Sequence, residues 1–98
     1  MTVKLSVTVN DTPIPADYFV EGFIDHTLSG MMEALEGTGK IKDLDLSIDG
    51  DKVVINLNGA KIPINEFVVK IVKGTTMGMV STLKGVKDIK KINIILHK

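Results

Sequence analysis

Asp25 and His26 are adjacent in the sequence and are the two residues best suited to acid–base chemistry. A carboxylate or an imidazole can each transfer a proton in an enzyme. Neither residue belongs to a group with the spacing of metal ligands, and the serines lack a nearby base and orienting group. We therefore predict no catalytic or metal-binding residue, and an enzyme that uses Asp25 or His26 is kept as an alternative.

Four aspartates near the middle of the chain suggest a cation site at first inspection: Asp43, Asp45, Asp49 and Asp51. They lack the loop glycine and the closing glutamate of a calcium-binding loop. Their spacing fits the solvent face of a strand and the two sides of a turn. The glycine-rich segment 37–40 follows a predicted helix, whereas phosphate binding uses glycines that precede a helix. No cofactor is expected.

The composition argues against several classes of partner. The 98 residues include no arginine, and 12 lysines balance 12 acidic residues, so no overall charge attracts nucleic acid or an anionic membrane. Cysteine is absent, which removes thiol chemistry and is compatible with the cytoplasm. No apolar run approaches the roughly 18 residues of a membrane-spanning helix, and the first residues lack a signal-peptide pattern. We expect a cytoplasmic protein that binds neither membrane nor nucleic acid.

The sequence resembles itself at an offset of 48 residues. Aligning 3–48 with 51–96, without a gap, gives 13 identical positions among 46. The matches include proline, glycine and threonine, which two unrelated segments of similar architecture would rarely share in one register. The chain is therefore predicted to be a single domain, residues 1–98, built from repeats 1–49 and 50–98.

Each repeat has the pattern of a strand, a helix and a second strand. The expected elements are strands at 3–9, 44–48, 53–57 and 92–96 and helices at 18–36 and 66–84. Asp17 and Asn65 are the predicted N-caps of the helices. We expect an α+β, ferredoxin-like βαββαβ two-layer sandwich with an internal pseudo-twofold axis, strand order 4-1-3-2 and both helices on one face. Whether Asn58-Gly59 closes an extra hairpin is left open.

The helix positions that match between the repeats fall on one side of each helix, and we predict that this side faces the sheet. The matched positions are 19/67, 23/71, 27/75, 30/78, 31/79 and 35/83. Gly30 and Gly78 lie in the middle of this stripe, although a glycine inside a helix costs about 1 kcal/mol relative to alanine. Close approach of the helix to the sheet or to the other helix is the expected reason.

The opposite helix faces are predicted to form a dimer interface. Residues 1–49 carry a net charge of −6 and residues 50–98 a net charge of +6, so the first helix of one copy should complement the second helix of another. The predicted interface residues are Asp25, Leu28, Met32, Val69, Lys73, Met77, Val80 and Lys84. Pairing of an acidic sheet edge with a basic one, through Asp43/Asp45 and Lys90/Lys91, is a second route. A monomer whose two helices pair with each other is the alternative.

Two segments near the end of the chain, 62–68 and 75–86, read IPINEFV and TTMGMVSTLKGV. They resemble the end of a family of small prokaryotic proteins of unknown function. The resemblance covers about a quarter of the chain and implies no activity.

Taken together, these features predict a non-catalytic interaction or regulatory domain that self-associates as a homodimer. A small-molecule sensor, with a ligand bound between protomers near the helix starts, is the first alternative. Ferredoxin-like folds host many functions, so the fold alone does not decide between them.

Overall fold

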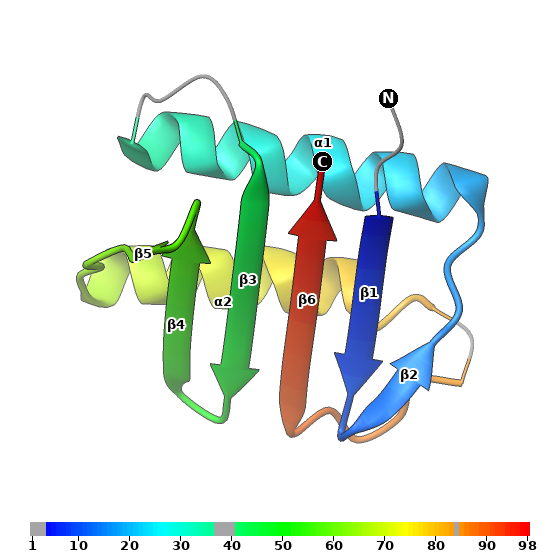
Figure 1. Cartoon of the computed structure of the whole chain (residues 1–98). Helices are drawn as coiled ribbons and strands as arrows, with labels where there is room; N and C mark the ends of the chain where they lie inside the picture. The colour runs from blue at the N-terminus through cyan, green and yellow to red at the C-terminus, as the bar shows by residue number, and fades with distance from the viewer. Residues whose placement is uncertain (1–3, 37–40, 84) are drawn as a thin grey trace.

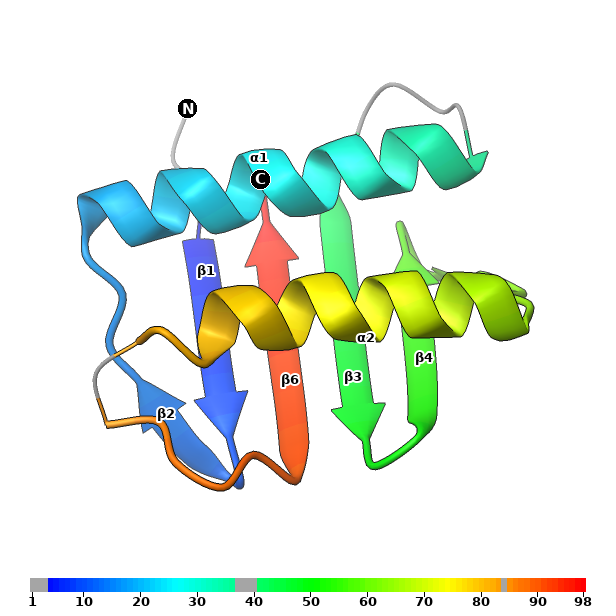
Figure 2. The same ribbon diagram turned by 180° about the vertical axis from the view of Figure 1, so that it is seen from behind.

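The computed structural model describes residues 4–36, 41–83 and 85–98. The elements in chain order are β1 (Lys4–Val9), β2 (Thr12–Ile14), α1 (Tyr18–Glu36), β3 (Asp43–Asp49), β4 (Lys52–Leu57), β5 (Ala60–Lys61), α2 (Glu66–Val80) and β6 (Lys91–His97). The strands form one antiparallel sheet in the order β2-β1-β6-β3-β4-β5. Both helices cover the same face of this sheet and run across the strands in opposite directions (Figures 1 and 2). The predicted α+β class and the placement of the helices are confirmed.

The predicted strand order is wrong. The order 4-1-3-2 would place the first strand of each repeat, β1 and β4, at the centre of the sheet. The structure instead places the second strands, β3 and β6, at the centre, and β1 and β4 outside them. Each pair of parallel strands is still separated by one strand of the other repeat, so both orders satisfy the same alternating pattern. The pattern alone therefore does not decide which strands are central.

Short additional strands lie at both edges of the sheet. The hairpin at Asn58-Gly59, which the sequence leaves open, is present and pairs β4 with β5. A corresponding hairpin pairs β1 with β2. The edge strands are two or three residues long, and short edges of this kind discourage pairing with other sheets.

The strand registers repeat with the offset seen in the sequence. Adding 48 to the first member of the Val7–Ile94 pair and subtracting 48 from the second gives the observed Ile55–Leu46 pair. The Leu46–Ile94 pair of the central ladder maps onto itself under the same operation. The β1–β2 and β4–β5 ladders are related by the same shift.

Two asparagines fix the ends of the central strands. Asn10 and Asn58 both have a positive φ, of 51° and 50°, which asparagine tolerates better than most residues. The side-chain oxygen of Asn58 accepts from the backbone N–H groups of Lys42 and Asp43, at 2.8 and 3.0 Å. Asn10 accepts from Lys90 and Lys91 at the same two distances. Each turn therefore holds the start of a neighbouring central strand.

The predicted helix starts are confirmed. The carboxylate of Asp17 accepts from the backbone N–H of Val20, and the side chain of Asn65 accepts from that of Val68, both at 2.9 Å. In each case the cap satisfies a donor that the first helical turn leaves free. Helix α2 ends at Val80, four residues earlier than predicted.

The core lies in one layer between the sheet and the helices. The inward residues of the strands and one stripe of each helix are buried: Val7, Val9, Ile24, Leu28, Met32, Leu44, Leu46, Ile48, Val53, Ile55, Leu57, Val72, Val80, Ile92, Ile94 and Leu96. The other face of the sheet has no helix over it and carries Ser6 and Ile95 as exposed residues. No described helix is long and apolar enough to cross a membrane.

Candidate interaction surface

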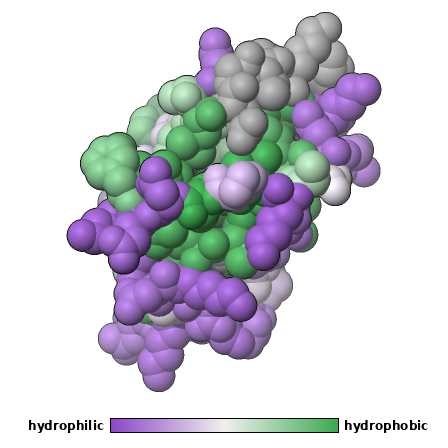
Figure 3. Space-filling model, turned by 90° about the vertical axis from the view of Figure 1, so that its left-hand side faces the viewer, coloured by the Kyte–Doolittle hydropathy of each residue, from purple (hydrophilic) through white to green (hydrophobic). Residues whose placement is uncertain are grey.

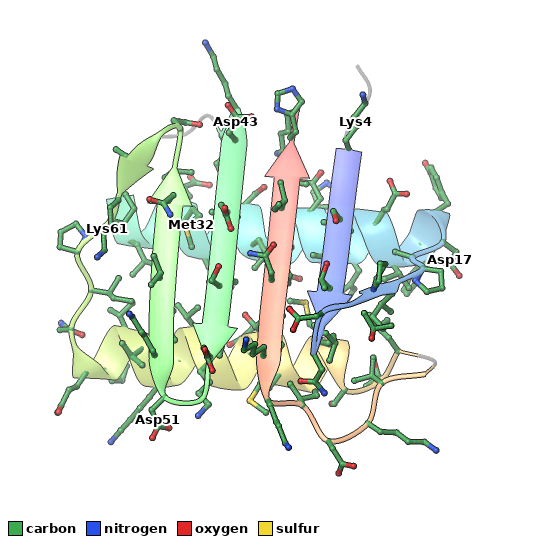
Figure 4. All side chains as sticks on the ribbon, turned by 60° about the horizontal axis from the view of Figure 1, so that its bottom comes forward. Lys4, Asp17, Met32, Asp43, Asp51 and Lys61 are labelled. Carbon is green, nitrogen blue, oxygen red and sulfur yellow. The ribbon has the colours of Figure 1, made fainter. Side chains whose placement is uncertain are left out.

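The stripe of each helix that faces the sheet is not the predicted one. Leu28, Met32 and Val80, which were predicted to lie in a dimer interface, each have 0% exposure. Met32 lies behind the sheet, on α1 (Figure 4). Helix α1 is apolar on two sides, so hydrophobic periodicity left the choice open, and the identity between the repeats pointed to the wrong side. This part of the predicted interface is the core of the molecule.

The outer surface of the helices carries half of the residues that were expected to face the sheet, whereas the pairs 27/75, 31/79 and 35/83 are half-buried at its margin. Phe19 and Phe67, which are equivalent in the two repeats, are 73% and 70% exposed. Phe23 and Ile71, another equivalent pair, are 53% and 50% exposed. We call these four residues, together with Gly30 and Gly78, the outer helix surface. Large apolar side chains that are exposed to solvent at equivalent positions of both repeats are unusual for a small monomeric protein.

The glycines of this surface have nothing beside them. Apart from the adjoining backbone of its own helix and its chain neighbours, a Cβ atom added at Gly30 or Gly78 would meet no atom within 4 Å, and the same holds for Gly22 and Gly74. The predicted close approach to the sheet or to the other helix is therefore wrong. Their location leaves the helix backbone accessible from outside.

A hollow lies between the two helices on this side of the molecule. Its volume is about 160 Å³, and it is lined by Phe19, Val20, Phe23 and Ile24 from α1 and by Met79, Thr82 and Leu83. The rings of Phe19 and Phe23 lie 6.1 Å apart at its rim. The lining is almost entirely apolar, and the volume suits one aromatic ring. At the opposite end of the helix pair, apolar surface also fills the middle of the view, between hydrophilic side chains (Figure 3).

The charged residues of the predicted interface are engaged within the chain. Asp25 lies 3.0 Å from the ammonium group of Lys98, and Lys73 lies 2.9 Å from Asp51. The hydrogen bond that Lys73 donates, and then its positive charge, lower the pKa of Asp51 below its ordinary value. Val69 and Met77 are half-buried on the far side of α2. Lys84 lies outside the described residues.

A second, shallower hollow lies at the start of α2. It encloses about 740 Å³ and is lined by Asp51, Ile64, Asn65, Glu66, Val69, Lys70, Lys73, Gly74 and Met77. It therefore gathers three predicted interface residues, Val69, Lys73 and Met77, around an exposed ion pair.

The sheet edges do not offer the predicted complementary charges. Asp43 and Asp45 lie on β3, Lys91 begins β6 and Lys90 directly precedes it, so all four lie on the two central strands or beside them and not at an edge. Asp49 is paired in register with Lys91, and Asp43 with His97. The opposite charges of the two repeats thus meet inside one molecule, and the proposed edge route between molecules is wrong.

The residues considered for catalysis do not form a catalytic arrangement. Asp25 accepts from Ser29 at 3.1 Å and pairs with Lys98, whereas His26 is exposed on the outside of the helix. His97 is the last residue of β6, and its Nδ1 contacts the carboxylate of Asp43. Within the described residues, no group of three or more histidine, aspartate or glutamate side chains could hold a metal ion.

Comparison with known proteins adds no assignment to these observations. No protein-family model matches the chain, and no match was found among curated proteins or solved structures.

Proposed function

We propose that this chain is a non-catalytic interaction domain that associates with a second copy of itself through the outer helix surface. The observation that carries the proposal is the exposure of Phe19, Phe23, Phe67 and Ile71, which is half or more for each. Their exposed parts amount to about 500 Å² in one copy, since a large aromatic side chain presents 150–250 Å². Two copies would bury about 1,000 Å² through these residues alone, which is where specific interfaces begin.

The shape of the molecule supports the same partner. The Cα atoms extend 34 × 34 × 18 Å, so the domain is a flat slab with one core layer. Its accessible surface of 6298 Å² is larger than the about 5,500 Å² usual for a monomer of this mass. Stacking two slabs through their helices would give a four-layer body with nearly equal dimensions.

We also propose that the two βαβ units arose by duplication, in a variant of the ferredoxin-like sandwich whose second strands are central. Two of the identical helix pairs lie on the outer helix surface and support a role for it, while the identical pairs 20/68, 27/75, 31/79 and 35/83 are half-buried. Phe19/Phe67 and Gly30/Gly78 are identical and exposed, whereas Leu28/Thr76 differ and are buried. A core tolerates such changes by repacking, but a surface used in both units retains its residues.

Sedimentation velocity over a wide concentration range tests self-association. The unmodified chain should sediment with a mass above 10.6 kDa at micromolar concentration and approach that mass on dilution. The double variant Phe19→Glu/Phe67→Glu should remain monomeric, because it replaces two apolar side chains of the outer helix surface by charges. It should still fold, because acidic residues are favourable in the first turn of a helix. Lys61→Glu makes the same change in net charge on β5 and should dimerise normally. A wild-type chain that stays at 10.6 kDa throughout would refute the proposal.

A small-molecule sensor is the second candidate, and the apolar hollow at the start of α1 favours it. A ligand with one aromatic ring would fit the volume of about 160 Å³. Toluene should then raise the melting temperature of the wild type, since binding to the folded state stabilises it. It should leave the melting temperature of Phe23→Glu unchanged. The resemblance to small prokaryotic proteins and the cytoplasmic location remain predictions.

A further inference from the structure

We infer that α1 of one copy lies over α2 of the other, with the twofold axis of the dimer parallel to the helices. This inference rests on the proposed self-association and specifies its geometry. It follows from two charged residues beside the outer helix surface, Glu33 on α1 and Lys70 on α2, both exposed. Among the described residues neither has an ion-pair partner inside the chain.

The alignment of the helices can be deduced from the hollow between them. Residues of the stretch 19–24 of α1 line the same hollow as Met79, in the last turn of α2, and Thr82 and Leu83, just after it, so the start of α1 is level with the end of α2. The helices are antiparallel (Figure 2), and both advance about 1.5 Å per residue. Ten residues further along α1 therefore corresponds to ten residues back along α2. Glu33 is level with Lys70.

Helical periodicity places both residues on the same relative flank. Glu33 follows Gly30 by three residues and Lys70 follows Phe67 by three, so each lies next to the outer helix surface. Each is on the flank of its helix that points away from the hollow. The two charges of one chain are thus separated by the full width of the helix pair.

A twofold axis parallel to the helices brings these charges together. Such an axis keeps the position of each residue along the helix and exchanges the two flanks, so the partner's Glu33 lies over Lys70. The symmetry gives two such ion pairs in one dimer. An axis perpendicular to the helices would instead place α1 over α1 and leave both charges unpaired.

The glycines agree with this arrangement. The partner's Gly30 comes level with residues 72–74 of α2, a stretch that includes Gly74. A Cβ at either glycine would meet no atom within 4 Å outside the adjoining backbone of its own helix and the residues next to it. Two bare stretches of backbone facing each other let the helices approach closely.

Charge reversal tests the orientation separately from self-association. Glu33→Lys and Lys70→Glu should each weaken the homodimer about tenfold or more at low salt, because each places two like-charge pairs across the interface. A mixture of the two variants should form heterodimers about as tightly as the wild type, since every pair is then opposite in charge. The double variant Glu33→Lys/Lys70→Glu should also dimerise as the wild type does, and Lys61→Glu is the control.

The outcomes are distinct. If the wild type dimerises but the mixture of variants gains nothing over the separate variants, the orientation is wrong while self-association stands. If the wild type is monomeric at every concentration, the proposed function fails together with the orientation. Thermal melting of each variant confirms that a loss of dimer is not a loss of folding.

Discussion

The inner and outer faces of the two helices differ in a way that informs the function of the molecule. The inner positions 24/72, 28/76 and 32/80 have at most 1% exposure, yet none is identical between the repeats. The outer pairs Phe19/Phe67 and Phe23/Ile71 agree in exposure to within 3%. Burial therefore constrains only the apolar character and volume of the inner face. These two outer pairs are kept similar although nothing among the described residues covers them, whereas other exposed pairs such as His26/Gly74 differ.

The largest expected effect separates the two faces by stability. Leu28→Ala should reduce the free energy of unfolding by about 2–5 kcal/mol, because it leaves a cavity in the core. Phe19→Ala should change it by less than about 1 kcal/mol, since most of this side chain is already in water. Urea unfolding at a concentration low enough to give monomers measures both. Similar losses for the two variants would contradict the assignment of the faces.

The turns at Asn10 and Asn58 extend the comparison to a pair of equivalent residues that both stabilise the fold. Asn10→Ala and Asn58→Ala should each cost about 1–3 kcal/mol, because two backbone N–H groups lose their acceptor. The two turns lie at opposite ends of the sheet (Figure 1), so the losses should add. Unfolding of the two single variants and the double variant measures this. If the double variant loses much less stability than the two single variants together, the two turns are energetically coupled.

The helix glycines sharpen the comparison, because their two possible roles predict opposite results. Gly30→Leu with Gly78→Leu should keep or slightly raise the stability of the monomer, since the space is open and leucine favours helix more than glycine does. The dimer should weaken about tenfold or more, because leucine holds the backbones apart. Sedimentation and urea unfolding of the same variant separate the two effects. A destabilised monomer would show that these positions are packed inside the chain.

The smallest effect concerns the ion pair of Asp51 with Lys73. The hydrogen bond and the charge of Lys73 lower the pKa of Asp51, so the pair stabilises the fold above the ordinary aspartate pKa of about 3.9. This contribution is lost as the pH falls through the lowered pKa. Lys73→Met should return the pKa of Asp51 towards its ordinary value in a carboxyl NMR titration. An unchanged pKa would mean that the pair is not populated in solution.

Much of the fold could be predicted from the sequence, because local signals determine it. Alternating residues defined the four long strands, and Asp17 and Asn65 marked the helix starts. The strand order depends instead on which of the two alternating orders buries more apolar surface. That is a non-local property of the fold. The inward faces of β3 and β6 contain only leucine and isoleucine, whereas those of β1 and β4 also contain valine, and this difference was the available signal for their central position.

The sequence predicted the character of the candidate surface but not most of the residues that form it. The sequence indicated an apolar helix face rimmed by charge, but assigned it to Leu28, Met32 and Val80 instead of Phe19, Phe23 and Phe67. Helix α1 has one apolar stripe with Leu28 and Met32 and another with Phe19 and Phe23. Packing against the sheet, which is not local, determined which of the two is buried. The aromatic residues were a usable signal, since aromatic side chains are enriched at protein interfaces.

Thiol labelling measures most directly whether the outer helix surface becomes covered, because the chain contains no cysteine of its own. Gly30→Cys places one thiol on this surface, and Ser6→Cys places one on the open face of the sheet. The account predicts that labelling at position 30 slows as the protein concentration rises through the dimerisation range, while labelling at position 6 does not change. Equal labelling rates at position 30 at all concentrations, or slowing at position 6 instead, would contradict the account.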